Sequence, residues 1–185
     1  MTSSKVRLDL FDSKVNLNRG KIFWVEMIWY LIKIFFFLSY IPYPNQLKVF
    51  LLKLFGAKVG KKIIIKPNVN ILFPWKLSIG DYVWIGEGVR VLNFESITIG
   101  CHVCISQNAF LCGGNHDYKK PEMEYKNGTI SLSDGCWVGA NVFVGPNVNI
   151  GYDTVVTAGS VVTRELQENA IYSGNPARFI KKRWV

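Results

Sequence analysis

Residues 132–163 read LSDGCWVGANVFVGPNVNIGYDTVVTAGSVVT, and every sixth residue of this stretch is aliphatic. The six aliphatic positions are Leu132, Val138, Val144, Ile150, Val156 and Val162. Four residues after each of them comes a second apolar or small residue, beginning with Cys136 and Val142. A six-residue unit comprises one short strand and one turn, and it buries its apolar face only by stacking on other units. The stretch therefore predicts a stack of hexapeptide units.

The same period runs backward through the chain as far as residue 59. Its nine further members are Val59, Ile65, Ile71, Ile79, Ile85, Val91, Ile99, Ile105 and Leu111. Three units close one triangular coil, and successive coils stack as parallel strands about 4.8 Å apart. We therefore expect an all-β fold, a parallel β-helix in which each inward side chain lies above its equivalent in the coil below.

The period is interrupted at three places, and each interruption follows the third strand of a coil. The spacing is eight residues across 71–79 and 91–99, and twenty-one across 111–132. The insertions must therefore emerge from one corner of the triangle, one above another. The longest, residues 113–131, predicts a projecting loop, and loops held on a rigid scaffold commonly carry function.

Four motifs follow one another in the order found in the hexapeptide-repeat acetyltransferases. They are Gly-Gly-Asn-His-Asp at 113–117, Cys-Trp-Val-Gly-Ala at 136–140, Ala-Gly-Ser-Val-Val-Thr at 158–163 and Gly-Asn-Pro-Ala-Arg at 174–178. Over residues 45–185 the chain resembles this family. It is most similar to the colanic-acid-biosynthesis and maltose–galactoside types of O-acetyltransferase, and it shares Pro-Trp-Lys-Leu-x-Ile-Gly at 74–80 with the former. The resemblance implies a left-handed β-helix, although the general crossover rule would favour the right hand.

We divide the chain into three parts. Residues 1–56 are an apolar segment with N-terminal helices, residues 57–165 form the left-handed β-helix with its loop at 113–131, and residues 166–185 form a C-terminal cap. The cap is expected to contain a short C-terminal helix that starts near Pro176.

The resemblance assigns the central chemical step to His116 in the long loop, because the family's loop histidine is a general base. An unperturbed imidazole has a pKa near 6.5, which suits removal of a proton from a sugar hydroxyl at neutral pH. The implied reaction transfers acetyl from acetyl-CoA to a hydroxyl of a sugar or polysaccharide precursor. The neighbouring Asp117 either orients the imidazole or caps the loop.

Three residues near the loop are predicted to contact the acceptor. The register places Asn93 about one coil below the loop root, and Glu95 likewise beneath Asn115. The side chains of Asn93 and Glu95 either bind a sugar hydroxyl or satisfy the backbone of their own bulge.

The residues expected to bind acetyl-CoA follow the loop in the sequence. By resemblance, Trp137 packs near the thioester and pantetheine arm of acetyl-CoA. The other matches to the cofactor side are the backbone at Gly139, Ala140 and Ala158 and the residues Thr163 and Arg164.

Basic residues at the C-terminus are candidates for the cofactor's phosphates. Arg178, Lys181 and Lys182 follow the predicted helix start, where backbone N–H groups and the helix dipole favour anions. A plain basic cap would have the same composition.

Two other functions are compatible with this fold. One is N-acetylation of an amino sugar or another amine, which only acceptor assays separate from O-acetylation. The other is a non-catalytic β-helix that binds or scaffolds, and lack of acetyl-CoA binding would favour it. A carbonic-anhydrase-like zinc site needs three histidines, so the two present argue against it and no metal is expected. The resemblance also implies a homotrimer.

The composition limits the partners and the cellular compartment that we expect for the protein. A net charge of +9 would suit nucleic acid, anionic lipid or a polyanionic cofactor, but no nucleic-acid motif is present, so we expect no nucleic-acid partner. The four cysteines do not form a disulfide framework. The leading segment does not resemble a signal peptide. We expect a cytoplasmic protein, with peripheral contact to the inner membrane as an open alternative.

The possible membrane contact concerns residues 21–38, which are mostly large and apolar. These residues predict a helix in which Glu26, Tyr30 and Lys33 lie along one stripe. Such a helix either covers the first coil, docks at a membrane surface or spans a membrane. A second helix is predicted over 45–55. Its capping residue is Asn45, and its apolar face is formed by Leu47, Phe50, Leu51 and Leu54.

Overall fold

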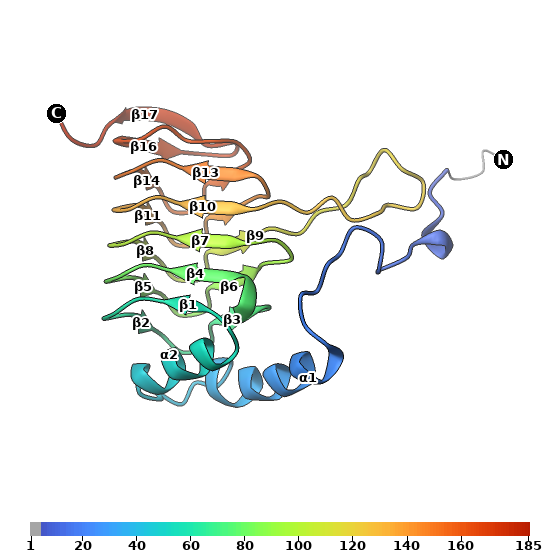
Figure 1. Cartoon of the computed structure of the whole chain (residues 1–185). Helices are drawn as coiled ribbons and strands as arrows, with labels where there is room; N and C mark the ends of the chain where they lie inside the picture. The colour runs from blue at the N-terminus through green and yellow to red at the C-terminus, as the bar shows by residue number, and fades with distance from the viewer. Residues whose placement is uncertain (1–4) are drawn as a thin grey trace.

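The computed structural model describes residues 5–185 and shows a left-handed parallel β-helix, a three-sided prism with helices at one end (Figure 1). From β1 to β15, every third strand along the chain lies in the same sheet. Sheet A contains β1 (Lys58–Val59), β4 (Leu77–Ile79), β7 (Ile97–Ile99), β10 (Ile130–Leu132) and β13 (Val148–Ile150). Sheet B contains β2 (Ile64–Ile65), β5 (Trp84–Ile85), β8 (Cys104–Ile105), β11 (Trp137–Val138), β14 (Val155–Val156), β16 (Ala170–Ser173) and β17 (Arg178–Lys182). Sheet C contains β3 (Asn70–Ile71), β6 (Arg90–Leu92), β9 (Phe110–Cys112), β12 (Phe143–Val144) and β15 (Val161–Val162).

The six-residue period is confirmed as the core of the prism. All fifteen predicted positions are buried, with exposed fractions of 9% or less. The register stacks equivalent residues directly, as in the pairing of Val138 with Ile105 below and Val156 above. The second inward slot is also buried throughout, and it includes the Cys136 thiol. The coils therefore form one continuous apolar column.

Two helices and a π-helical turn cover the open end of the first coil. They are α1 (Phe23–Ile32), η2 (Lys33–Phe37) and α2 (Asn45–Leu54). The lower edge of sheet C is satisfied from α1 and η2, because Trp29 Nε1 donates to Ile71 O at 3.1 Å and Val69 N donates to Phe37 O at 3.1 Å. An unpaired strand edge invites association with other chains, so this cover protects the prism.

Side chains of α2 satisfy the lower edge of sheet B. Lys48 is 1% exposed, and its Nζ donates to Ile65 O and Lys66 O at 3.1 Å each. Asn45 Oδ1 accepts a hydrogen bond from Ile65 N at 2.9 Å. The helix thus presents one donor group and one acceptor group to a strand that has no lower neighbour.

The predicted cap of α2 is therefore wrong, and its predicted apolar face is correct only for Leu47 and Leu51, which pack on the core. Asn45 does not cap the helix, since its side chain is bonded to Ile65. Phe50 and Leu54 point outward, whereas Lys48 and Leu52 are buried. The carbonyl groups of the strand edge need a donor, and this need outweighs the burial of two large apolar side chains.

The predicted C-terminal helix is also wrong. Residues 170–182 form a hairpin in which β16 continues sheet B and β17 pairs antiparallel with it. A helix would have left the upper edge of β16 unpaired, and β17 covers it instead. The remaining helical turns are η1 (Leu8–Leu10) and η3 (Pro74–Lys76).

Within residues 5–185, no helix has both the length and the apolar character that a membrane span requires. The expectation of a span through 21–38 therefore has no support in this structure, since α1 and η2 together cover only residues 23–37.

Candidate active site

The long loop leaves the prism at the corner between sheets C and A and folds as a hairpin (Figure 1). Gly128 N donates to Gly113 O at 2.9 Å, and Lys126 N donates to Asn115 O at 2.8 Å. His116 and Tyr125 form an antiparallel bridge further along the hairpin. The loop ends two residues earlier than predicted, because Ile130 and the residue after it belong to β10.

The imidazole of His116 is held by a carbonyl group of its own loop. Its Nδ1 lies 2.5 Å from Met123 O. A carbonyl oxygen only accepts, so Nδ1 carries the proton in this contact, and Nε2 of the neutral ring keeps its lone pair. Met123 adopts a φ of 51°, which few residues with a side chain adopt, at the place where the hairpin turns back toward His116. Sequence reasoning missed Met123, since a backbone carbonyl has no residue-specific signal.

Two aromatic rings pack against the imidazole. The ring centroid of Tyr125 lies 4.9 Å from that of His116, and the centroid of Phe11 lies 5.5 Å away. Phe11 also contacts Tyr125 at 5.3 Å. The imidazole is therefore half-buried and its ring plane is restrained, although the loop lies outside the prism.

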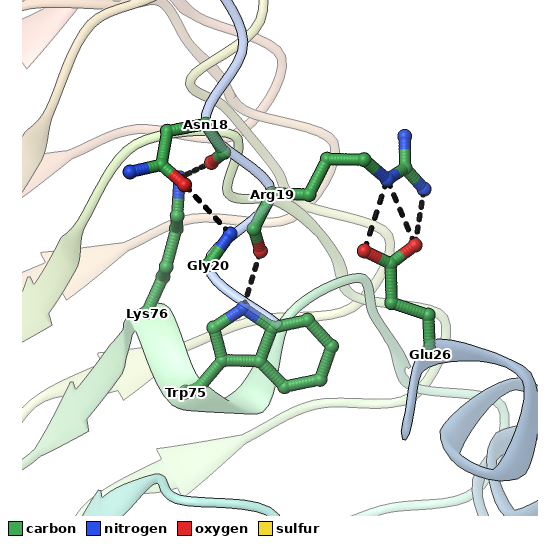
Figure 2. A network of polar contacts seen from close by, with 6 residues as sticks. All are labelled: Asn18, Arg19, Gly20, Glu26, Trp75 and Lys76. Carbon is green, nitrogen blue, oxygen red and sulfur yellow. Dashed lines mark hydrogen bonds and ion pairs between the residues drawn. The ribbon is translucent and has the colours of Figure 1, made fainter. Parts of the chain in front are cut away.

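Phe11 belongs to an N-terminal arm, residues 5–22, which runs from the helical end of the prism to the loop. Figure 2 shows how the arm is anchored: Trp75 Nε1 donates to Arg19 O at 2.7 Å, and Lys76 Nζ donates to Asn18 O. At the far end, Arg7 N donates to Pro121 O at 2.8 Å. The arm thus links the first bulge of the prism to the loop that carries His116.

Asp117 does not orient the imidazole. Its Oδ1 accepts a hydrogen bond from Lys119 N at 3.1 Å, and its Oδ2 lies 3.6 Å from Lys126 Nζ. These contacts, the backbone hydrogen bond first, hold the pKa of the Asp117 carboxyl below its usual range. The geometry is that of the other interpretation, in which Asp117 caps the turn of the loop.

Asn93 lies beneath the loop root but has no exposed surface. Its Oδ1 accepts from Phe73 N at 2.9 Å, and its Nδ2 donates to Phe73 O at 2.6 Å. The side chain therefore satisfies the backbone of the bulge in the coil below, which is the second of the two interpretations of Asn93.

Glu95 and Asn115 remain near the surface of the same corner. Glu95 is half-buried in the second bulge, next to Phe94, whose ring contacts Tyr125 of the loop at 5.4 Å. Asn115 is exposed, and its Oδ1 accepts a hydrogen bond from His116 N at 2.9 Å. This bond shapes the turn at His116 and leaves the Asn115 amide nitrogen at the surface.

Trp137 lies on the outer face of sheet B and is about half exposed. Its Nε1 donates to Ser106 Oγ at 2.9 Å, which restrains the indole ring. Gly139 and Ala140 follow at the corner between sheets B and C, directly below Ala158. A Cβ at Gly139 would lie 2.6 Å from Ala158 N, so only glycine permits this stacking.

The remaining predicted cofactor residues are divided between two places. Arg178, Lys181 and Lys182 lie exposed on β17, in the same sheet as Trp137. They form part of a strand, so a helix dipole does not contribute there. Thr163 and Arg164 are exposed after β15, at the corner from which the His116 loop emerges two coils below.

The cysteines and acidic residues offer no second reactive centre in the described part of the chain. Burial raises the pKa of the Cys136 thiol to about 11, so it remains protonated at neutral pH and is a poor nucleophile. Across residues 5–185, no cluster of three or more His, Cys, Asp or Glu side chains is placed to hold a metal ion.

Known proteins with similar structures share this fold. The hexapeptide-repeat acetyltransferase VCA0836 from Vibrio cholerae, in a complex with acetyl coenzyme A, superposes with a TM-score of 0.82 at 24% identity, covering 99% of this chain and all of that one. Another structure of VCA0836 has a TM-score of 0.77 at 27% identity and covers 87% of this chain and 92% of that one. No family model matches the chain.

Sequence similarity identifies the family directly. WcaF of Escherichia coli K12, an acetyltransferase named for colanic acid biosynthesis, is 45% identical over 136 residues, which are 74% of this chain and 75% of WcaF. The galactoside O-acetyltransferase of the same organism is 27% identical over 71% of this chain and 66% of its own length. Together with the β-helix and its loop, these similarities show that the chain belongs to the hexapeptide-repeat acetyltransferases and is an acyltransferase.

Proposed function

We propose that the protein transfers an acetyl group from acetyl-CoA to a hydroxyl of a sugar or polysaccharide precursor, with His116 as the general base. The observation that carries this proposal is the 2.5 Å contact between His116 Nδ1 and Met123 O, which leaves Nε2 as the basic nitrogen. WcaF and galactoside O-acetyltransferase, by their names, support acetyl transfer and a carbohydrate acceptor.

In the proposed reaction, the acceptor hydroxyl attacks the thioester carbonyl carbon while His116 Nε2 removes the hydroxyl proton. The tetrahedral intermediate collapses, the C–S bond breaks, and the proton returns to the departing sulfur, so that the products are the acetyl ester and CoA. The Nδ1–H···O contact to Met123 stabilises the imidazolium that forms between the two proton transfers. General base catalysis of this kind contributes about 10²- to 10⁴-fold.

The test is release of CoA thiol from acetyl-CoA in the presence of a panel of nucleotide sugars and oligosaccharides, with matched amino sugars as a second arm. We expect release that depends on a hydroxyl acceptor and an ester product that alkali cleaves. An amide product, formed only with the amino sugars, would establish N-acetylation instead. Failure to bind acetyl-CoA at all would favour a non-catalytic β-helix.

We also propose that the active site is completed between copies of the chain in a homotrimer. The corner that carries the His116 loop lies between sheets C and A, whereas Trp137 lies on sheet B, the side of the triangle opposite that corner. The two predicted halves of the site are therefore far apart on one prism. A cyclic arrangement in which each loop reaches the sheet B of a neighbour would give three equivalent sites.

We further propose that the outer face of α1 contacts an anionic membrane surface. Trp24, Ile28 and Leu31 of α1 and Phe35 of the following η2 are each more than half exposed, whereas the charged residues of α1 and η2 face the prism. Residues 13–66 carry eight exposed Lys or Arg residues, since Lys33 and Lys48 of this range are buried, and one half-buried Glu. An apolar helix face beside a basic surface is the pattern of an interfacial helix.

A further inference from the structure

A cavity of about 380 Å³ lies between α1 and the first bulge of the prism. Its walls are mainly apolar and aromatic, and they include Trp29 from α1 and Leu72, Phe73 and Trp75 from the prism. The volume lies within the range of small-ligand sites, and mostly apolar walls with a few polar groups are usual for them. None of the groups assigned above to acetyl transfer lines this cavity.

Lys33 borders the cavity with a side chain that is only 6% exposed. Within residues 5–185 its ammonium group forms no ion pair, and it lies over the face of the Tyr30 ring, with Nζ 5.3 Å from the ring centroid. Lys48 is equally buried but is bonded to two strand carbonyls, so its burial has a structural purpose. Lys33 has no such partner, although a buried cation without one is costly.

The other charged residues around the cavity also leave an excess of positive charge. Glu26 is the only acidic residue among those that line it, and it is bonded to Arg19 at 2.5 to 2.9 Å (Figure 2). Once this pair is set aside, Lys21 and Lys33 remain as positive charges. Burial lowers the pKa of Lys33, which is the sign of an ammonium group that lacks compensation.

We propose that this cavity binds an amphipathic anion, with an apolar chain or ring against the aromatic walls and a phosphate or carboxylate against the Lys33 ammonium group. An anion supplies the partner that Lys33 lacks, and the apolar part of the ligand covers Met27 and Tyr30, the lining residues that are 39% and 51% exposed. Binding requires both parts at once: a free phosphate leaves the apolar walls uncovered, and a neutral chain leaves the ammonium group unpaired.

Titration calorimetry of the full-length protein with geranyl phosphate tests the proposal, with inorganic phosphate and geraniol as the two partial ligands. We expect saturable binding of one geranyl phosphate per chain, and affinities at least about tenfold weaker for each partial ligand. Lys33→Met should weaken geranyl phosphate binding at least about tenfold, since a charge-assisted contact is lost and a side chain of similar length is kept. Lys53→Met is the matched control, because it removes the same charge from an exposed position on α2.

A second variant, Leu72→Trp, keeps Lys33 and fills the cavity, so it should abolish binding as well. Thermal melts of both variants establish that they are folded. Equal binding of geraniol and geranyl phosphate, or unchanged binding by Lys33→Met, would overturn the proposal. So would absence of saturable geranyl phosphate binding by the wild-type protein. Binding of inorganic phosphate as tight as that of geranyl phosphate would assign the site to a free anion and would overturn the amphipathic assignment.

Discussion

The coils of the prism direct their aliphatic side chains inward, whereas the helix that covers them carries large apolar side chains on both its inner and its outer face. In every coil the aliphatic residues of the six-residue period face inward, and the buried polar side chains of the described coils are limited to Asn93, Thr154 and Ser160. In α1 the outer face carries Trp24 and Leu31, whereas Glu26 and the following Lys33 lie toward the prism. The difference shows that a helix covering the end of a β-helix must do more than shield the apolar column. It must also provide hydrogen-bond partners for the backbone groups of the open strand edge.

The largest expected effect compares one substitution in the two regions. Leu111→Ala, at a position in the coils with no exposed surface, should lower the free energy of unfolding by about 2 to 5 kcal/mol. Leu31→Ala, on the outer face of α1, should change it by less than about 0.5 kcal/mol. Urea denaturation at equal protein concentration measures both. Equal destabilisation would mean that the outer face of α1 is buried in the folded protein.

Membrane contact gives the next largest effect. Trp24→Glu should weaken binding to phosphatidylglycerol vesicles at least about tenfold, because it places a negative charge in the proposed interfacial face. Trp84→Glu makes the same change on sheet B, at a residue that is half exposed, and should leave vesicle binding unchanged. Co-sedimentation with anionic and with phosphatidylcholine vesicles provides the measurement. If both variants bind vesicles as the wild type does, the outer face of α1 has another role.

A smaller effect is expected at Trp137. Trp137→Ala should raise the KM for acetyl-CoA about fivefold with a smaller change in kcat, since an aromatic contact with the pantetheine arm contributes about 1 kcal/mol. Trp84 lies in the same sheet with a similar exposed fraction, so Trp84→Ala is the matched control. Steady-state kinetics with varied acetyl-CoA distinguish them. A KM that is unchanged in Trp137→Ala would remove this residue from the cofactor side.

The smallest effect is a pH dependence of stability that arises from Lys33, on the inner face of η2. The pKa of Lys33 is lowered in the folded protein, so the unfolded chain binds the extra proton and folding weakens below the unfolded pKa of about 10.4. Lys33→Met should therefore be more stable than the wild type at pH 7, and this advantage should shrink as the pH rises toward 10. Thermal melts across that range test the sign. An advantage that grows with pH would show that Lys33 is stabilised as a cation.

The sequence predicted the coils well because one physical requirement repeats. Each unit must bury the same face, so Val59 and Val162 obey one rule although they lie more than 100 residues apart. The three interruptions of that rule also located the corner and the His116 loop. Where the period ends, prediction became weaker. The face of α2 was wrong for Phe50 and Leu54, because Lys48 donates to the carbonyl groups of a strand edge and the helical pattern of the sequence does not show that need.

The surroundings of His116 were only partly predictable for a related reason. Phe11 contacts the imidazole from an arm far from His116 in the sequence, and Tyr125 contacts it from the other side of the same loop. Both residues lie outside the repeats, so the six-residue spacing does not predict these contacts. Asp117 was a natural candidate for orienting His116 because it is adjacent in sequence, yet the Met123 carbonyl holds the ring. The C-terminal residues 178–182 were expected in a helix, but the unpaired edge of β16 makes them a strand.

The most direct test of the proposed function compares the two histidines of the chain. His116→Asn keeps a side-chain donor for Met123 O but has no base, whereas His102→Asn changes an exposed ring that stacks on Tyr82 at another corner. Asparagine also tolerates the positive φ of 57° at His102. Acetyl transfer to the best acceptor from the panel should fall at least about 10²-fold in kcat for His116→Asn and stay within about twofold of the wild type for His102→Asn. Turnover by His116→Asn near that of the wild type would contradict the account.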